Sequence, residues 1–328
     1  FMVFLVVVNN NYNNGDKNQV EEGASINSYF IFLTAVVLSI ALFYSYKNLI
    51  INPYKSLKDN VYSQILIDRN YELGMKYLKE SVSRDTVLDL DLRTTAANTI
   101  FNYYVSSGIA KEQKKEDLDF AIALYKKNLE HLPDDMYYNY KIGEIINYRF
   151  SVDLDEKYIS EARQYVDKAI SFSPNRPRIY YMLTTNQLME GKIDDAIKTA
   201  EYAVSLNDKF GESYWELTKT YYIAMKKEKA KENLIKTINF GYRISEDNLI
   251  IFEPLFKTRE SVKSQIEFLE LIVKNGTKNY LYPSTLANLY KEIGDKENAI
   301  KYAKISVEIN PSAKEKVDNF IKSINESK

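Results

Sequence analysis

Apolar positions recur at helical spacing along most of the chain, and between Pro177 and Tyr242 the whole pattern repeats after 34 residues. Eight positions of the first copy have counterparts 34 residues later, and six of the eight pairs keep side-chain size or polarity. A repeating unit of this length cannot bury its apolar face alone, so it needs its neighbours. The pattern therefore predicts a row of stacked units rather than one globular core.

Each unit has the pattern of two antiparallel helices. One apolar set lies in Tyr180–Gln187 and a second in Ala196–Val204, both at helical spacing. Gly191 lies between them, where a residue that tolerates positive φ ends the first helix at little cost. The small residues Ala196 and Ala203 let the two helices approach closely. The unit is therefore predicted to be a helical hairpin.

This pattern resembles the tetratricopeptide repeat (TPR), which has a 34-residue period. The best copy, near the C-terminus, has these residues at the family's spacing: Leu286, Ala287, Tyr290, Gly294, Asp295, Ala299, Ile300 and Pro311, with Ser306 in place of the family's second Ala. The resemblance implies an all-α fold, a TPR-type α-solenoid of about seven helical hairpins wound as a right-handed superhelix.

Seven repeats can be placed along the chain. They run approximately over Tyr54–Thr86, Val87–Asp135, Met136–Arg176, Pro177–Phe210, Gly211–Ile244, Ser245–Asn279 and Tyr280–Ala313. Two copies are longer than the period, and we expect the extra residues, Ser106–Asp117 and Phe150–Glu156, to form loops between the helices of a pair.

An uncharged apolar run, Ala24–Tyr46, precedes the repeats. Its 23 residues would span roughly 35 Å as a helix, enough for the roughly 30 Å hydrocarbon layer of a bilayer. Tyrosines lie toward its ends, where aromatic rings favour the membrane interface. The run is predicted to be a transmembrane helix; the alternatives are a buried core helix and a cleaved signal peptide, which the acidic flank before the run disfavours.

These boundaries predict five parts. Residues 1–23 are the end of an apolar segment plus a polar loop, 24–46 the transmembrane helix, 47–53 a linker, 54–313 the solenoid and 314–328 a capping helix. Because the chain begins with Phe1 rather than Met, we interpret it as the end of a longer protein.

Composition limits the chemistry of the visible chain. Its 44 basic and 45 acidic residues are balanced, so no strong field favours nucleic acid. It has no cysteine, and His131 is its single histidine, which excludes thiolate chemistry and a histidine metal site within one chain. Glycine-rich phosphate loops are absent, and the paired carboxylates lie at predicted helix starts, where they are ordinary caps. We expect no catalytic residue, metal or cofactor in this chain.

The family's geometry implies a concave face formed by the first helix of each hairpin. On that face rings alternate with charged and hydrogen-bonding groups, an arrangement that suits a protein partner or extended peptide, with sugar rings as a further possibility. The residues expected to bind the partner are Tyr137, Tyr140, Tyr148, Arg178, Tyr181, Thr185, Glu212, Trp215, Lys219 and Tyr222. The alternative is that a chain with 28 tyrosines uses these rings only for packing between repeats.

The sequence favours a membrane-anchored scaffold for protein interaction. The repeats are expected on the cytoplasmic side, because Lys47, Lys55 and Lys58 follow the span while only Lys17 precedes it. A second hypothesis comes from residues 1–58: a closing apolar helix followed by Asn-Pro-Tyr is similar to the C-terminal part of bacterial O-antigen ligase or polymerase-like proteins. That resemblance implies an enzyme that transfers glycans, with its catalytic part upstream of this chain. The apolar run disfavours a third hypothesis, a free cytosolic co-chaperone.

Overall fold

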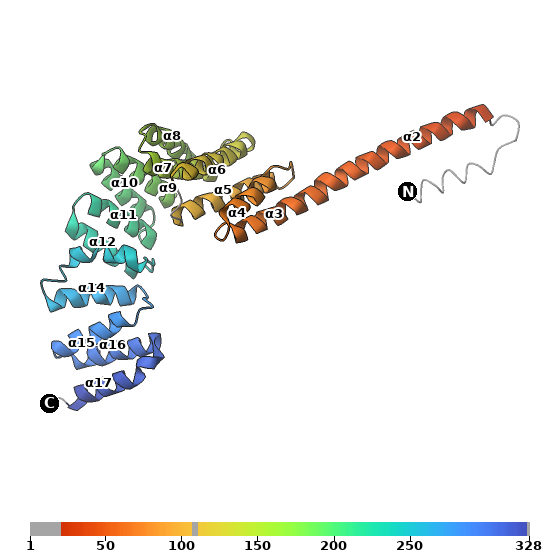
Figure 1. Cartoon of the computed structure of the whole chain (residues 1–328). Helices are drawn as coiled ribbons and strands as arrows, with labels where there is room; N and C mark the ends of the chain where they lie inside the picture. The colour runs from red at the N-terminus through yellow and green to blue at the C-terminus, as the bar shows by residue number, and fades with distance from the viewer. Residues whose placement is uncertain (1–20, 107–110, 327–328) are drawn as a thin grey trace. The chain divides into compact units, whose positions relative to one another are not determined.

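The computed structural model describes residues 21–106 and 111–326, and within these ranges the regular structure is helical, without strands (Figure 1). The chain divides into two compact units, residues 1–128 and 129–328. The all-α prediction is confirmed, and the helices pack as successive hairpins. The predicted apolar segment and polar loop of residues 1–20 lie outside the described residues.

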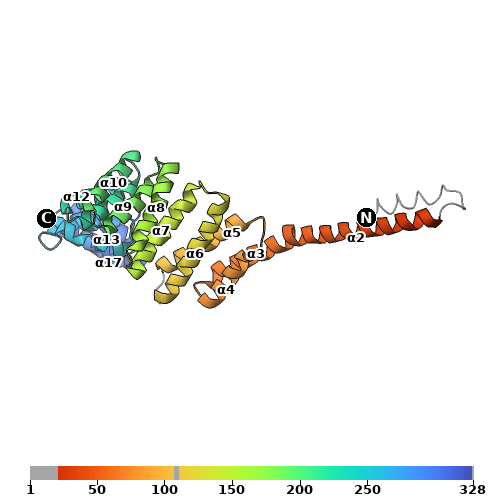
Figure 2. The ribbon, with the colours of Figure 1, turned by 90° about the horizontal axis from the view of Figure 1, so that it is seen from above.

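Unit 1 contains one long helix and the first hairpins. Its elements are α2 (Glu21–Tyr46), the π-helical turn η1 (Lys47–Ile51), α3 (Asn52–Leu66), α4 (Tyr71–Val82), α5 (Asp89–Ser106) and most of α6 (Lys111–His131). The segment predicted as a linker is thus helical and joins α2 directly to α3, as the orange and red part of Figure 2 shows. Pro53 closely follows this π-helical turn, and a proline at that place removes one backbone N–H donor from the continuous helix.

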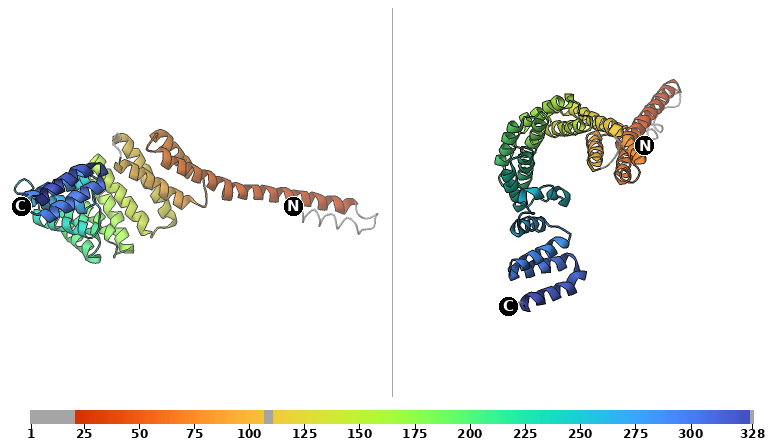
Figure 3. Two further views of the ribbon diagram at one scale, coloured as in Figure 1. Left: turned by 90° about the horizontal axis from the view of Figure 1, so that it is seen from below. Right: turned by 60° about the vertical axis from the view of Figure 1, so that its left-hand side comes forward.

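Unit 2 contains the remaining hairpins and a terminal helix. Its elements are α7 (Met136–Asp153), α8 (Lys157–Phe172), α9 (Pro177–Met189), α10 (Ile193–Leu206), α11 (Gly211–Ile223), α12 (Lys227–Asn239), α13 (Glu246–Ile250), η2 (Glu253–Phe256), α14 (Val262–Lys274), α15 (Leu281–Glu292), α16 (Lys296–Ile309), η3 (Pro311–Ala313) and α17 (Lys314–Glu326). The last hairpin, α15 with α16, is followed by α17 (Figure 3). The apolar side chains of α17 pack on the core of the preceding hairpins.

The turns between paired helices use left-handed backbone, as the sequence predicts. Gly191 has φ of +73° and Gly294 has φ of +80° at equivalent turns. At the position that corresponds to Gly191 in the next repeat, Met225 adopts φ of +58°. Ala196 and Ala203 are fully buried, which confirms the predicted close approach of the two helices.

The two lengthened repeats differ from the prediction. The loop expected at Ser106–Asp117 is wrong where it is described, because α6 already begins at Lys111. The loop expected at Phe150–Glu156 is confirmed only for its last three residues, because α7 continues to Asp153 and α8 begins at Lys157. The extra residues lengthen helices instead, and α7 ends only where Leu154 adopts φ of +58°. Charged residues can extend a helix in water as readily as they can form a loop.

The sixth repeat lacks a regular first helix. The segment after Ser245 forms the short α13 and the 3₁₀ turn η2, with Pro254 in its first turn. Phe252, Leu255 and Phe256 are nevertheless buried, so this irregular segment still fills the space between α12 and α14. The repeat keeps its packing residues while it loses the straight first helix.

Among the described residues, one helix is long and apolar enough, by length and composition, to cross a membrane. It covers Tyr29–Leu66, near the N-terminus, and none of its most apolar window is buried in the structure. This helix overlaps the predicted span Ala24–Tyr46.

Candidate functional site

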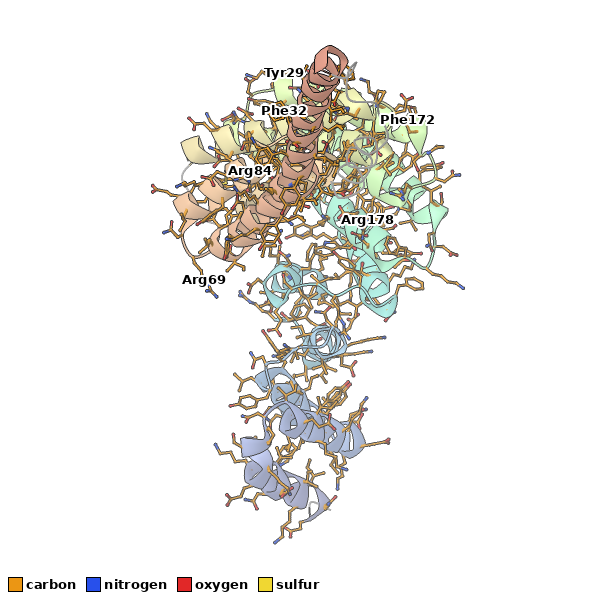
Figure 4. The ribbon with its side chains drawn as sticks, turned by 90° about the vertical axis from the view of Figure 1, so that its right-hand side faces the viewer. Tyr29, Phe32, Arg69, Arg84, Phe172 and Arg178 are labelled. Carbon is orange, nitrogen blue, oxygen red and sulfur yellow. The ribbon has the colours of Figure 1, made fainter. Side chains whose placement is uncertain are left out.

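A cavity of about 870 Å³ lies in unit 2 on the first helices of three consecutive hairpins, α7, α9 and α11. Its lining comprises Met136, Tyr137, Tyr140, Lys141, Glu144, Arg176, Pro177, Arg178, Ile179, Tyr181, Met182, Thr185, Phe210, Glu212, Glu216 and Lys219. The volume falls within the roughly 300–1,000 Å³ range of ligand pockets. Figure 4 marks Arg178, on α9, among the side chains of this region.

Three ion pairs organise the charges of the cavity. Within α7, Lys141 Nζ lies 2.5 Å from Glu144 Oε2. Within α11, Lys219 Nζ lies 2.9 Å from Glu216 Oε2. Between α9 and α11, Arg178 Nε donates to Glu212 Oε2 at 2.8 Å, and this contact ties two repeats together across the cavity.

Arg176 is the fourth basic side chain of the lining. It is exposed, and among the described residues no carboxylate lies within ion-pair distance of it. The three acidic side chains of the lining are already paired within the protein. Arg176 is therefore available to a carboxylate supplied from outside.

Tyrosine rings form the other part of the lining. Burial raises the pKa of Tyr140, and Glu144 raises that pKa further by accepting a hydrogen bond from the Tyr140 hydroxyl at 3.3 Å. Burial also raises the pKa of Tyr181, whose hydroxyl lies 2.5 Å from Ser213 Oγ on α11. Both phenols consequently remain protonated hydrogen-bond donors at neutral pH. Tyr137 is more open, with 37% of its surface exposed.

Local sequence explains how closely α11 approaches the next hairpin. Gly211 begins α11, and a Cβ placed there would lie 2.8 Å from Tyr242 Cβ and 2.9 Å from the Thr237 carbonyl oxygen. Only glycine fits that contact without a shift of the backbone. The close approach sets the position of Glu212, one residue later, for its ion pair with Arg178.

Seven of the ten predicted partner-binding residues line the cavity. These are Tyr137, Tyr140, Arg178, Tyr181, Thr185, Glu212 and Lys219. Tyr148, Trp215 and Tyr222 do not line it. Trp215 is only 8% exposed and belongs to the apolar core, and the Tyr222 ring packs 4.8 Å from that of Phe252. Tyr148, three turns into α7, is half-buried away from the cavity.

Several lining residues were not in the predicted set, including Lys141, Arg176, Met182 and Glu216. On α7, α9 and α11 the lining includes a second residue four positions after the first one. On α11 these two residues are Glu212 and Glu216, and Trp215 does not line the cavity. Helical spacing alternates between three and four, and a pattern alone does not decide which neighbour turns inward. The 34-residue step from Met182 to Glu216 was the signal that could have identified the second row.

The described residues hold no group of three or more His, Cys, Asp or Glu placed to bind a metal ion. The single histidine, His131, is exposed at the end of α6. The cavity offers rings, phenol hydroxyls and guanidinium groups, which are binding groups.

No protein-family model matches the chain, and no curated protein matches it significantly. Solved structures with similar folds include MamA, residue 41 to the end, from Desulfovibrio magneticus RS-1, at 18% identity and a TM-score of 0.40, covering 57% of this chain and 94% of that one. TTC0263, described as a thermophilic TPR protein in Thermus thermophilus, is similar at 12% identity and a TM-score of 0.37, covering 72% and 98%. Pseudomonas aeruginosa PilF is similar at 15% identity and a TM-score of 0.37, covering 83% and 99%.

Proposed function

We propose that this protein is an interaction scaffold that binds an extended segment of a partner protein in the cavity between α7, α9 and α11. The observation that supports the proposal is the lining itself, in which tyrosine rings lie between ion pairs that already satisfy the acidic side chains. Large rigid rings bury contact area at low entropic cost. The stacked hairpins hold them without any help from the partner.

The same lining defines the chemistry of the partner. The guanidinium of Arg176 is a donor. The single phenol proton of Tyr140 is donated to Glu144, and the Tyr181 hydroxyl is engaged with Ser213, so the two phenol oxygens can still accept hydrogen bonds. An extended peptide supplies N–H groups to these oxygens, and an acidic side chain of the peptide matches Arg176. The favoured partner is therefore an extended, acidic peptide segment, and a glycan is the second candidate for the same rings.

We propose further that α2 anchors the scaffold in a lipid bilayer. The 26 residues of α2 correspond to a length of roughly 39 Å, more than the hydrocarbon thickness. The described large side chains of α2, such as Phe32 and Phe43, are mostly exposed, so they need an apolar surrounding. The exposed Lys47, Lys55 and Lys58 after the span support a cytoplasmic location of the repeats. The similarity to O-antigen ligases stays a prediction.

A photo-crosslinking amino acid tests the cavity directly. Placed at Tyr137 in the full chain, it should capture a partner protein in cells, whereas at Phe172 it should not. Phe172 is a matched control, because it is an equally exposed ring at the end of the second helix α8. Capture of the same protein at Phe172 but not at Tyr137 would move the site to the other face.

Two substitutions then test the chemistry. Arg176→Glu and Tyr137→Ala should each weaken binding of the captured partner on the order of thirtyfold, the equivalent of about 2 kcal/mol. Helicity should be unchanged, because both side chains are exposed. If both variants bound the partner as tightly as the unaltered protein does, the assignment of the cavity would be wrong.

Extraction of membranes with alkaline carbonate tests the anchor. The chain should stay with the lipid fraction, whereas a peripheral protein would be released. Protease added to intact spheroplasts should spare the repeats, and their digestion would place them on the other side of the membrane.

A further inference from the structure

The middle helix of the cavity, α9, differs in charge from the two helices beside it. On α7 the ion pair of Lys141 with Glu144 lines the cavity, and on α11 the ion pair of Glu216 with Lys219 does so. Helix α9 contains no acidic residue, and Met182 takes the place that Glu216 takes 34 residues later. An uncharged strip of α9 therefore lies between two walls whose charges are already paired.

The centre of this strip is apolar and continuous with the core. Met182 is half-buried, as are Met136 and Tyr140 of α7, and all three line the cavity. They pack against the buried cluster that contains Ile179 and Tyr181. We name Met136, Tyr140 and Met182 the apolar subsite. Its side chains present carbon and sulfur to the cavity from a base that the repeats hold in place.

Two hydroxyl groups beside the apolar subsite use their protons within the protein. Thr185 Oγ1 donates to the Tyr181 carbonyl oxygen at 3.0 Å, one turn back on α9. The Tyr140 hydroxyl donates to Glu144. A hydrogen-bond acceptor placed over Met182 would therefore receive no proton from either group, and its lost contact with water would not be replaced. An apolar side chain needs no donor there and gains by leaving water.

The ion pairs of α7 and α11 form a rim around the subsite. Each pair neutralises itself, so neither wall attracts a single charge from a partner. Charged groups that surround an apolar contact contribute little energy themselves, but they keep water away from the side chain at the centre. This is the arrangement of an anchor pocket, in which one buried side chain of the partner supplies much of the binding energy.

The geometry points to Met182 as the residue that selects the partner, because the apolar subsite receives one large aliphatic or aromatic side chain of the bound segment. This inference rests on the proposed function of the cavity and narrows its partner: the segment carries an apolar anchor as well as an acidic residue. Methionine is unbranched and flexible, so the subsite adapts to leucine, methionine or phenylalanine rather than to one shape.

The helix also sets the distance between the two recognised side chains. Arg176 is the N-cap of α9, and Met182 lies six residues later, roughly 9 Å along the axis. In an extended strand, residues two positions apart share a side and are roughly 7 Å apart; in a polyproline II segment, residues three positions apart are roughly 9 Å apart. The acidic residue and the apolar anchor should therefore be two or three positions apart.

Selection from a random library of 12-residue peptides displayed on phage tests this inference. The full chain in phospholipid nanodiscs is the bait, and empty nanodiscs remove peptides that bind lipid. Enriched peptides should carry a large apolar residue two or three positions from Asp or Glu. In a synthetic copy of an enriched peptide, moving the acidic residue to six positions from the anchor should weaken binding as much as replacing it by serine does.

Substitutions at Met182 test the subsite itself. Met182→Gln keeps the length of the side chain and should weaken binding of the enriched peptide about tenfold, measured by fluorescence anisotropy, whereas Met182→Leu should bind within about twofold. Met189→Gln, at a half-buried position of the same helix outside the cavity, is the matched control and should bind normally. Circular dichroism checks that each variant keeps its helicity.

A second selection keeps the inference testable if Met182→Gln fails to fold. Met182→Ala enlarges the subsite, so the library selected on this variant should shift from leucine and methionine toward phenylalanine and tryptophan. A structural role of Met182 alone would leave the selected residue unchanged. The same preference on both proteins would therefore overturn the assignment of Met182.

The outcomes separate this inference from the proposed function. Peptides without an apolar anchor whose binding depends on Arg176 and Tyr137, but not on Met182, would overturn the subsite and keep the cavity as the binding site. Peptides whose binding depends on none of the three residues, or a library that yields no binder, would overturn both.

Discussion

Phe252 packs the edge of its ring against Trp215, with the ring centroids 5.4 Å apart and the ring planes inclined at 69°. The same Phe252 ring lies 4.8 Å from that of Tyr222. Phe252 comes from the irregular first half of the sixth repeat, between α13 and η2. The row of open rings that begins on α7 and α9 therefore ends at α11, because the next repeat covers the rings that would continue it.

This packing predicts that Trp215 contributes to stability rather than to partner binding. Trp215→Ala should lower the free energy of unfolding by about 3 to 5 kcal/mol, the usual cost of removing a large buried ring. Phe252→Ala should cost a similar amount and should also shift Trp215 fluorescence to the red, because Trp215 is the only tryptophan. Denaturant melts followed by circular dichroism measure both effects.

The control for this prediction is Ile223→Ala, on the same helix, whose side chain is 53% exposed. It should change the free energy of unfolding by less than about 0.5 kcal/mol. A fully stable Trp215→Ala variant with weakened partner binding would instead return Trp215 to the binding face.

The turn at Met225 predicts a stabilising substitution. Met225 has φ of +58°, in the left-handed region where a side chain costs roughly 1–2 kcal/mol, and its side chain is 74% exposed. Met225→Gly removes that strain and loses little contact, while glycine costs some entropy in the unfolded chain. The net effect should be a gain of about 0.5–1 kcal/mol in the free energy of unfolding.

Gly191→Ala is the matched test at the equivalent turn. A Cβ at Gly191 would meet no atom within 4 Å, so the variant isolates the cost of the positive φ. It should destabilise the protein while Met225→Gly stabilises it. Shifts of both variants in the same direction would contradict the equivalence of the two turns.

Sequence predicted the hairpins well because its strongest signals are local. Gly191, Ala196 and Ala203 report a turn and a close helix approach through their own size and backbone freedom, and the structure confirms each of them. The break in the sixth repeat depends instead on how Phe252 and Leu255 pack against distant helices. That information is absent from any one period of the pattern.

The candidate site was predicted less completely for the same reason. Spacing placed Tyr140, Tyr181 and Trp215 at equivalent positions, and the structure leaves only the first two at the cavity. Which ring is covered depends on the neighbouring repeat, not on the helix that carries the ring. The exposure of apolar side chains on α3, such as Leu57 and Val61, escaped notice because the pattern gives amphipathicity but not its direction relative to the core.

Asn275 holds a turn of unit 2 by two hydrogen bonds to one residue. Its Oδ1 accepts from the Ile244 backbone N–H at 3.0 Å, and its Nδ2 donates to the Ile244 carbonyl at 2.6 Å. Asn275 is 6% exposed. Asn275→Ala leaves buried backbone groups unsatisfied and should cost about 2–4 kcal/mol in the free energy of unfolding.

The control is Asn288→Ala on α15, an exposed asparagine whose amide makes one local hydrogen bond to the Ser284 carbonyl. It should cost less than about 0.5 kcal/mol.

The Asn275–Gly–Thr sequence has the form of a glycosylation site, but the buried amide nitrogen is already engaged. Treatment of the purified protein with a glycosidase should therefore leave its mass unchanged at this site.

Asp117 predicts a pH dependence of stability in unit 1. This carboxylate is 2% exposed on α6 and accepts hydrogen bonds from the hydroxyls of Tyr71 at the start of α4 and Tyr104 on α5. Burial raises the pKa of Asp117 to about 6, above its ordinary value of 3.8. The folded protein therefore holds this proton more tightly than the unfolded chain does. The free energy of unfolding should rise as the pH falls from neutrality through about 6, by at most about 3 kcal/mol.

Asp117→Asn carries no titrating group and should remove this part of the pH dependence. Hydrogen exchange of the amides of α4 and α5, followed between about pH 5 and pH 8, compares the two proteins after correction for the intrinsic exchange rate. Asp91→Asn, at an exposed position of α5, should keep the pH dependence of the free energy of unfolding that the unaltered protein shows. A free energy of unfolding that falls as the pH falls through about 6 would contradict the prediction. It would mean that the hydrogen bonds from the two tyrosines outweigh burial and hold the pKa of Asp117 below its ordinary value, because hydrogen bonds to the ionised form favour that form.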